Sequence, residues 1–346
     1  MNSDKFINHL RARRIPVRAM IQLTYKCNFR CVHCYETPLK GVKEESPSLD
    51  EWAQILKVLR EHGCMFLTFT GGEIFTIPFF MELYEYAYDL GFKISLVSNG
   101  SLITSQVITL FESKKPEKVY ISLYGMSDNT YTTFCQAKGS YDKVISNITQ
   151  LRSSNINTVI MYLTNILNWK ELNSAYDFAH DQHCQFYQFY RFRACVDGDC
   201  SPQAYQLDAK TLVAIQPKDE LEILYNKTIS DKHQWLEGYK WCNAGLTSIM
   251  VDPQGRAFLC DSVAAKRFPI LQHDFDEIWK NLYAQRKQYI EVPSACSECG
   301  NRELCGVCAP TLVTEHGGCS IIPTRECTYA ADLRVALEEK YNVQDM

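Results

Sequence analysis

The chain has no long apolar run, no export signal and no large excess of charge. No stretch of about 18 apolar residues occurs that could cross a membrane, and the amino terminus lacks the hydrophobic core of a signal peptide. The formal net charge of −4 argues against an electrostatic nucleic-acid binder. We therefore expect a cytoplasmic protein that binds neither membranes nor nucleic acid. We expect the short basic run at 11–14 to be a solvated turn.

Cysteine, by contrast, is abundant, since the 346 residues include 16 cysteines. Without an export signal these do not indicate disulfides, because the cytosol keeps thiols reduced. Ten of them fall into two groups, three at 27–34 and seven within 242–327, with Cys319 left out of the second group, and such clustering is typical of metal binding. Hydrophobic residues make up 46% of the chain and charged residues 22%, which indicates a globular protein with room for a large and a smaller domain.

The first group places Cys27, Cys31 and Cys34 directly after an apolar segment at 17–24 that is typical of a buried strand. Structural zinc normally takes four protein ligands, and iron–sulfur clusters are commonly held by four cysteines. Three local thiols without an obvious fourth therefore favour a [4Fe–4S] cluster with one iron left open for a small molecule. The alternative is a zinc loop that takes a ligand from elsewhere in the chain.

Strands and helices are expected to alternate along the first half of the chain. Hydrophobic periodicity predicts strands at 17–24, 65–70, 92–97, 118–123, 156–163 and 184–192, with helices at 49–62, 78–90, 104–112, 141–152 and 169–181. Such alternation predicts parallel strands with right-handed crossovers, and six units are too few for an eight-stranded barrel. The cysteine loop and the segments at 71–73 and 98–99 follow the first three strands. They would therefore meet at the carboxyl edge of the sheet, where sites form in such folds.

The cysteine spacing, with His33 before the last cysteine, resembles the signature of radical S-adenosylmethionine (SAM) enzymes. The resemblance implies an α/β fold, a partial (β/α)6 barrel, in which Cys27, Cys31 and Cys34 hold a [4Fe–4S] cluster. SAM would chelate the open iron, and the reduced cluster would cleave it to a 5′-deoxyadenosyl radical that abstracts hydrogen from a substrate.

Further residues resemble the SAM-binding segments of that family. Gly71, Gly72 and Glu73 resemble its GGE motif, which binds the SAM amino group, although Ile74 stands where the family often has proline. Ser98 and Asn99 resemble the segment that contacts the ribose and carboxylate. Two further SAM-site candidates rest on position alone, and an ordinary polar residue at a strand end is an equal alternative for each: Ser122 and Arg191.

The second cysteine group contains seven cysteines, more than one four-ligand site can use. They are Cys242, Cys260, Cys296, Cys299, Cys305, Cys308 and Cys327. A turn at 252–255 predicts a hairpin between 248–251 and 256–260 within this region. Two zinc sites in a zinc-ribbon binding protein are the alternative of a different class, but they leave the first 240 residues unexplained.

This pattern resembles the SPASM extension of radical SAM peptide and protein maturases, which carries two auxiliary [4Fe–4S] clusters. The resemblance assigns the outer cluster to Cys296, Cys299, Cys305 and Cys327, and the inner one to Cys242, Cys260 and Cys308. Two departures affect the inner set. Cys305 and Cys308 are separated by two residues instead of three, and Ser248 stands where some members have a further ligand. The inner cluster would then keep an open iron, or be completed by Cys319 or by substrate.

The resemblance divides the chain into a barrel at 1–195, a linker with a helix near 209–227 at 196–240, and a SPASM domain with a carboxyl-terminal helix at 241–346. It implies a maturase that introduces a thioether or carbon–carbon crosslink, or another oxidative modification, into a ribosomally made peptide. The alternatives are an anaerobic sulfatase-maturing enzyme and a small-molecule dehydrogenase. Asp261 occupies the position of the catalytic base proposed for formylglycine-forming members, with a plain hairpin-end carboxylate as an equal alternative.

The expected partners follow from the same resemblance. They are a peptide or protein substrate and an electron donor such as flavodoxin or ferredoxin. Only residues 1–16 precede the first expected strand, which leaves no room there for a peptide-recognition domain. A separate leader-recognition protein, or a surface of this chain, would then bind a leader peptide.

Overall fold

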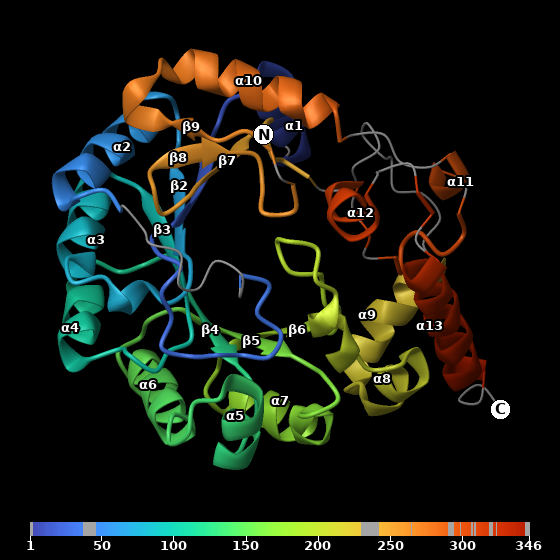
Figure 1. Ribbon diagram of the computed structural model, residues 1–346. Helices are drawn as coiled ribbons and strands as arrows, with labels where there is room; N and C mark the ends of the chain where they lie inside the picture. The colour runs from blue at the N-terminus through green and yellow to red at the C-terminus, as the bar shows by residue number, and fades with distance from the viewer. Residues whose placement is uncertain are drawn as a thin grey trace.

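Six parallel strands form an open barrel, as Figure 1 shows. The computed structural model describes residues 3–36, 46–229, 242–263, 265–289, 294–297, 299–305, 307, 309–317, 321–322 and 324–342. The strands lie in the order β6-β5-β4-β3-β2-β1, each parallel to its neighbour. The prediction of a partial (β/α)6 barrel is therefore confirmed. The strands are β1 (Arg18–Gln22), β2 (Phe66–Thr70), β3 (Lys93–Ser98), β4 (Lys118–Leu123), β5 (Thr158–Leu163) and β6 (Gln185–Phe189).

Helices cover the outer face of this sheet (Figure 1). They are α2 (Leu49–Glu61), α3 (Phe80–Asp89), α4 (Ser105–Ser113), α6 (Tyr141–Ser153) and α7 (Leu172–Asp181), with short 3-10 turns η2 (Ile74–Thr76) and η3 (Trp169–Glu171). Their apolar spacing explains the match to the expected ranges. In α2, for example, a capping box between Ser48 and Glu51 starts the helix, and Trp52 is among the residues buried against the sheet.

Two α-helices within residues 1–195 were not predicted. Helix α5 (Asp128–Cys135) contains three threonines, an aspartate and an asparagine among its eight residues, so its apolar periodicity is weak. Helix α1 (Ser3–Arg13) covers most of the solvated turn expected at 11–14: residues 12–14 are exposed as expected, but only Arg14 lies in a turn. Arg11 Nε donates to Asn243 Oδ1 at 2.9 Å, and the Arg14 guanidinium lies 4.5 Å from the centre of the Tyr283 ring.

The carboxyl-terminal part extends the same sheet. Strand β7 (Ser248–Val251) pairs in parallel with β1, and β8 (Arg256–Phe258) pairs antiparallel with β7. The hairpin predicted at this place is therefore present. A short strand β9 (Phe268–Pro269) follows β8, and then η5 (Ile270–Gln272) and α10 (Phe275–Lys287). The pairing of β7 with β1 brings the loop after β8 close to the cysteine loop that follows β1.

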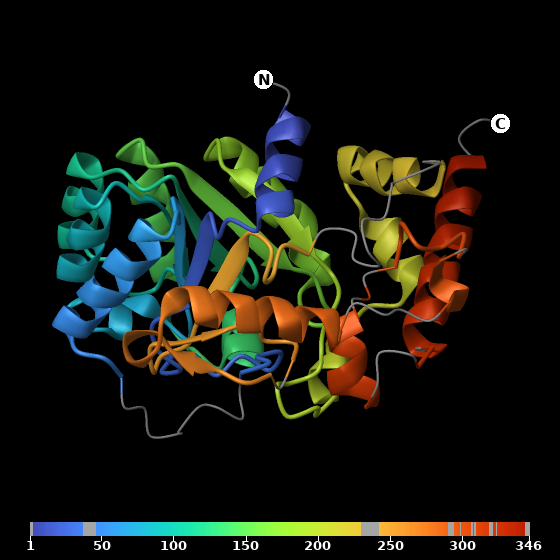
Figure 2. The same cartoon turned by 90° about the horizontal axis from the view of Figure 1, so that it is seen from above.

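A second, smaller core lies beside the open side of the barrel (Figures 1 and 2). It is formed by α8 (Ala209–Ile215), α9 (Lys218–Ile229) and α13 (Thr324–Asn342), with Leu212 and Leu333 fully buried. Pro217 separates α8 from α9, so the single helix expected at 209–227 is two helices. The remaining elements are η4 (Ser201–Tyr205), α11 (Ser294–Ser297) and α12 (Ala309–His316). Within the described residues, no helix combines the length and apolarity needed to span a membrane.

Candidate functional site

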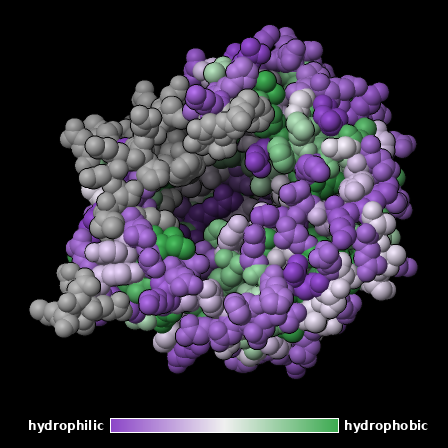
Figure 3. All heavy atoms as spheres, turned by 180° about the vertical axis from the view of Figure 1, so that it is seen from behind, coloured by the Kyte–Doolittle hydropathy of each residue, from purple (hydrophilic) through white to green (hydrophobic). Residues whose placement is uncertain are grey.

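The three cysteines after β1 line one cavity of about 200 Å³ at the carboxyl ends of the strands. Cys27, Cys31 and Cys34 share it with Ser98 at the end of β3, with Asn99 directly after that strand and with Ser122 on β4. The loop is held in a tight turn, since Arg30 Nη1 donates to the Cys27 carbonyl at 2.6 Å and the Cys34 N–H donates to the Cys31 carbonyl at 3.1 Å. Seen from behind, the molecule is hollowed near its centre, with hydrophilic surface inside (Figure 3).

Helix α5 is hydrogen-bonded to the cysteine loop through its last residues. The Arg30 N–H donates to the Cys135 carbonyl and the Val32 N–H to the Phe134 carbonyl, both at 2.9 Å. His33 stacks on Phe134 with ring centres 4.9 Å apart and an interplanar angle of 8°. The loop conformation therefore depends on a helix that lies about 100 residues further along the chain.

The two glycines of the Gly71-Gly72-Glu73 segment allow close approach to the chain that leads into the cysteine loop. The Gly72 N–H donates to the Thr24 carbonyl at 2.7 Å, and the Glu73 N–H to the Lys26 carbonyl at 2.8 Å. A Cβ atom on Gly71 would overlap the Thr24 backbone, and one on Gly72 the Lys26 backbone. Gly71 also has a φ of +131°, which side-chain-bearing residues rarely adopt. Both glycines line the cavity as well.

Glu73 lies behind the cavity wall and has no exposed surface. Its carboxylate accepts hydrogen bonds from Ser98 Oγ at 2.9 Å, the Asn99 N–H at 2.7 Å and the Phe75 N–H at 3.2 Å. Burial raises the pKa of Glu73 to about 7, against the opposing effect of these hydrogen bonds. Glu73 therefore positions Ser98 and Asn99, which line the cavity, and does not line the cavity itself.

Asn99 connects the cavity wall to the cysteine loop. Its Nδ2 donates to Asn28 Oδ1 at 2.9 Å and lies 3.9 Å from Cys27 Sγ. Its Oδ1 accepts from the Ser101 hydroxyl at 2.6 Å. Ser122 reaches the same cavity from β4 and hydrogen-bonds to Tyr124.

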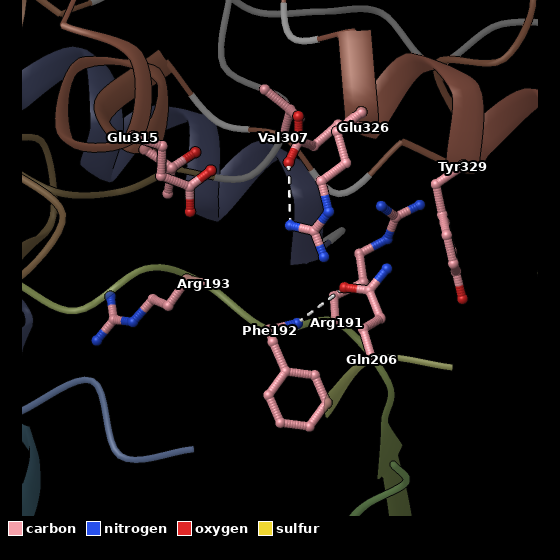
Figure 4. Close-up of a pocket in the computed structure, with 10 residues that line it drawn as sticks. Arg191, Phe192, Arg193, Gln206, Val307, Glu315, Glu326 and Tyr329 are labelled. Carbon is pink, nitrogen blue, oxygen red and sulfur yellow. Dashed lines mark hydrogen bonds and ion pairs between the residues drawn. The ribbon is translucent and has the colours of Figure 1, made fainter. Parts of the chain in front are cut away.

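Arg191 lies elsewhere. It lines a second cavity of about 240 Å³ between the end of β6 and helices α12 and α13, together with Arg193 and Arg325. In Figure 4 the Arg193 side chain points away from Arg191. The Arg191 guanidinium donates to the Leu304 carbonyl and lies 4.7 Å from the centre of the Tyr329 ring. Arg191 thus links the barrel to the carboxyl-terminal part and does not line the cysteine cavity.

Asp261 is connected to the cysteine cavity by a buried amide. Gln22 Nε2 donates to Glu36 Oε1 at 2.7 Å and to Asp261 Oδ1 at 3.0 Å, and Glu36 lines the cavity. Arg193 Nη2 lies 3.7 Å from Asp261 Oδ2, and its guanidinium lies 3.4 Å from the centre of the Tyr35 ring. Burial raises the pKa of Asp261, and Arg193 opposes that shift. Sequence reasoning missed Gln22, Glu36 and Arg193, because no local pattern distinguishes them.

The structure brings four of the carboxyl-terminal cysteines together. Burial raises the pKa of the Cys296 and Cys327 thiols, and their neighbours Cys305 and Cys299 add to both shifts. The Arg302 guanidinium interacts with three of these sulfurs. This is the set predicted for the outer cluster, and four adjacent thiols suit an iron–sulfur cluster.

The inner set is less completely described. Arg286 Nη1 donates to Cys242 Sγ at 3.4 Å, and Cys260 directly precedes Asp261 after β8. Cys308 and Cys319 lie outside the described residues.

The open barrel and the thiol-lined cavity at its carboxyl edge define a class, an α/β-barrel enzyme with a cofactor site in that cavity. A sequence model of the Radical SAM superfamily matches residues 21–179, and the chain is a radical SAM enzyme. The match implies SAM and a [4Fe–4S] cluster as cofactors, and the three thiols in one cavity fit such a cluster. The zinc-ribbon alternative does not account for this match.

Individual relatives extend the likeness over most of the chain. An AdoMet-dependent heme synthase from Methanosarcina barkeri (strain Fusaro) is 23% identical over 311 residues, covering 83% of this chain and 89% of that protein. The subtilosin biosynthesis protein AlbA from Bacillus subtilis (strain 168), which serves an antilisterial bacteriocin, is 28% identical over 149 residues. That match covers 41% of this chain and 32% of AlbA.

The fold is also that of a solved maturase-type structure. Streptococcus suis SuiB bound to S-adenosylmethionine superposes with a TM-score of 0.72 at 16% identity, covering 94% of this chain and 81% of that chain. SuiB has also been solved with its precursor peptide SuiA. The fold of this radical SAM enzyme therefore resembles that of SPASM-type maturases over nearly the whole chain.

Proposed function

We propose that this enzyme modifies a residue of a ribosomally made peptide and forms a crosslink or another oxidative modification. The observation that carries the proposal is the meeting of Cys27, Cys31 and Cys34 with Ser98 and Asn99 around one cavity at the carboxyl edge of the barrel. SAM bound at the open iron of a [4Fe–4S] cluster would supply a 5′-deoxyadenosyl radical, which takes a hydrogen atom from the substrate. Two similar proteins support a peptide substrate: SuiB has been solved with its precursor peptide SuiA, and AlbA takes part in the biosynthesis of a bacteriocin.

The residues of the cavity divide into three proposed roles. The three thiols would hold the cluster. Gly71, Gly72, Ser98, Asn99 and Ser122 would contact SAM, because they supply the polar groups of the same cavity. Glu73 would act through Ser98 and Asn99, to which its carboxylate is hydrogen-bonded. Arg191 has a weaker claim to SAM, because it lines the second cavity.

We propose two auxiliary [4Fe–4S] clusters in the carboxyl-terminal part. The outer one would use Cys296, Cys299, Cys305 and Cys327, whose mutual proximity supports the assignment. The inner one would use Cys242, Cys260 and Cys308. Hydrogen abstraction leaves a radical on the substrate. When this radical forms the new bond and the bonding partner loses a proton, one electron remains, and the auxiliary clusters would accept it.

The second cavity is the proposed place for the substrate. It opens beside the cysteine cavity, since Arg193 lines it and also stacks on Tyr35, which lines the cysteine cavity. Asp261 does not line this cavity, but its carboxylate faces Arg193, which does, and we propose that it takes a proton from the substrate. The alternative is formylglycine formation in a sulfatase, in which Asp261 would be the catalytic base.

A small carboxylate-bearing substrate is the second candidate. The heme synthase aligns over more of this chain than AlbA does, and Arg191 and Arg325, whose guanidinium groups suit carboxylates, line the second cavity. We also propose an electron donor such as flavodoxin or ferredoxin, a separate leader-recognition protein if the peptide carries a leader, and a cytoplasmic location, where thiols stay reduced.

The decisive experiment compares substrates for the reconstituted enzyme with SAM and a reductant. A cysteine-, tyrosine- or tryptophan-containing peptide encoded beside the gene is tested against an iron porphyrin with carboxylate side chains. The proposal expects 5′-deoxyadenosine formation to rise with the peptide, together with a mass change of the peptide. A rise with the porphyrin alone would replace the peptide assignment by the second candidate.

A further inference from the structure

Cys135 is a buried thiol that belongs to none of the proposed ligand sets. It is the last residue of α5 and has no exposed surface. The carbonyls of Phe134 and Cys135 accept the N–H groups of Val32 and Arg30, both at 2.9 Å. These two hydrogen bonds lie on either side of Cys31 in sequence, so the end of α5 runs alongside that cysteine.

The side chains of the two cysteines meet as well. The Cys135 thiol is hydrogen-bonded to Cys31 and also interacts electrostatically with Cys27. Once Cys31 has given up its proton to bind iron, its sulfur can only accept a hydrogen bond, so Cys135, a thiol outside the proposed ligand sets, is the donor.

We propose that Cys135 is a positioning residue that donates its S–H to Cys31 Sγ and thereby raises the reduction potential of the cluster held by Cys27, Cys31 and Cys34. A donor to a ligand sulfur withdraws electron density from the cluster and stabilises the reduced form, which carries more negative charge. The inference rests on the proposed function only in placing the cluster at these three cysteines. It adds a residue that makes the cluster easier to reduce before SAM is cleaved.

The test uses the full chain with its clusters reconstituted and three variants. Cys135→Ala removes the donor, and Cys135→Ser replaces it by a hydroxyl. Cys64→Ala is the matched control, because Cys64 is an equally buried thiol whose S–H donates to the Pro16 carbonyl at 2.7 Å, away from the cysteine loop. Iron is quantified for each protein, and the midpoint potential is measured by titration followed by electron paramagnetic resonance, using the signal that added SAM perturbs.

We expect all three variants to keep the iron content of the wild type. The midpoint potential should fall in Cys135→Ala, return toward the wild-type value in Cys135→Ser, and stay unchanged in Cys64→Ala. An unchanged potential in Cys135→Ala would overturn the inference, as would an equal fall in Cys64→Ala, which would trace the effect to lost packing.

Loss of iron from both Cys135 variants would also overturn it, because Cys135 would then be needed to assemble the cluster and not to tune it. A wild-type protein in which no such signal can be reconstituted would instead remove the proposed function. The two failures are therefore distinguishable.

Discussion

Replacing Glu73 by alanine should weaken SAM binding although Glu73 does not reach the cavity. The carboxylate accepts three hydrogen bonds from buried or half-buried donors, and two of these come from Ser98 and Asn99 at 2.9 and 2.7 Å. Alanine leaves the Asn99 N–H and the Ser98 hydroxyl without that acceptor. Both residues line the cavity that we assign to SAM.

The size of the effect follows from those two donors. A buried donor left unsatisfied costs about 1–3 kcal/mol, so the pair costs about 2–6 kcal/mol if the segment keeps its shape. If Ser98 and Asn99 move to find other partners, part of this cost appears as lost contacts to SAM. A loss of about 2 kcal/mol of SAM binding free energy corresponds to a roughly 30-fold higher dissociation constant.

Equilibrium binding of SAM to the reconstituted protein measures this directly, with iron content determined in parallel. Glu51→Ala serves as the control, because it removes a carboxylate that accepts two hydrogen bonds from Ser48 on the outer helix α2. We expect weak SAM binding with normal iron in Glu73→Ala, and normal binding in the control. Unchanged affinity in Glu73→Ala with normal iron would refute the positioning role of Glu73.

Three further predictions concern single residues. Gly72→Ala should lose the iron of the SAM cluster, because the new Cβ would meet the Lys26 backbone at a cost of about 1–3 kcal/mol or more. Gly139→Ala is the control: it places alanine at a φ of +71° but meets no atom within 4 Å, so it should keep the iron. Burial raises the pKa of Glu73 from 4.5 to about 7, so Glu73 ionises at lower pH in the unfolded chain than in the folded protein. The free energy of unfolding should therefore fall by about 3 kcal/mol as the pH rises from 4.5 to about 7. Denaturation experiments on Glu73→Gln at pH 5 and 7.5 should not show this fall. Cys260→Ala should still cleave SAM without coupling but yield no modified peptide, measured side by side in soluble protein. Wild-type product yield from a variant shown to lack the inner cluster would contradict the electron-accepting role.

The barrel could be predicted because its signals are local. Apolar periodicity, the capping box at Ser48 and Glu51, and glycine at helix ends each fix one element without reference to the rest of the chain. Parallel strands then place the loops after β1, β2 and β3 at one edge, so the meeting of Cys27, Gly71 and Ser98 also followed.

The remainder depends on contacts between distant segments. Gln22 and Asp261 meet across 239 positions only because β7 pairs with β1 in one register. Helix α5 forms on a weakly apolar sequence because it packs beneath the cysteine loop, so neither the helix nor the contact of Cys135 with Cys31 had a local signal. Glu73 was expected to touch SAM, but its own neighbours occupy its carboxylate, which only the packing of β3 against η2 determines.

The central claim is that the loop at 27–34 holds the cluster that cleaves SAM. The most direct measurement determines iron, labile sulfide and 5′-deoxyadenosine in the anaerobically reconstituted wild type and in a variant with Cys27, Cys31 and Cys34 all replaced by alanine. Three four-iron clusters predict about 12 iron atoms per wild-type chain, falling to about 8 in the variant with no 5′-deoxyadenosine formed. Stoichiometric zinc with negligible sulfide in the wild type, or continued 5′-deoxyadenosine formation by the variant, would contradict the account.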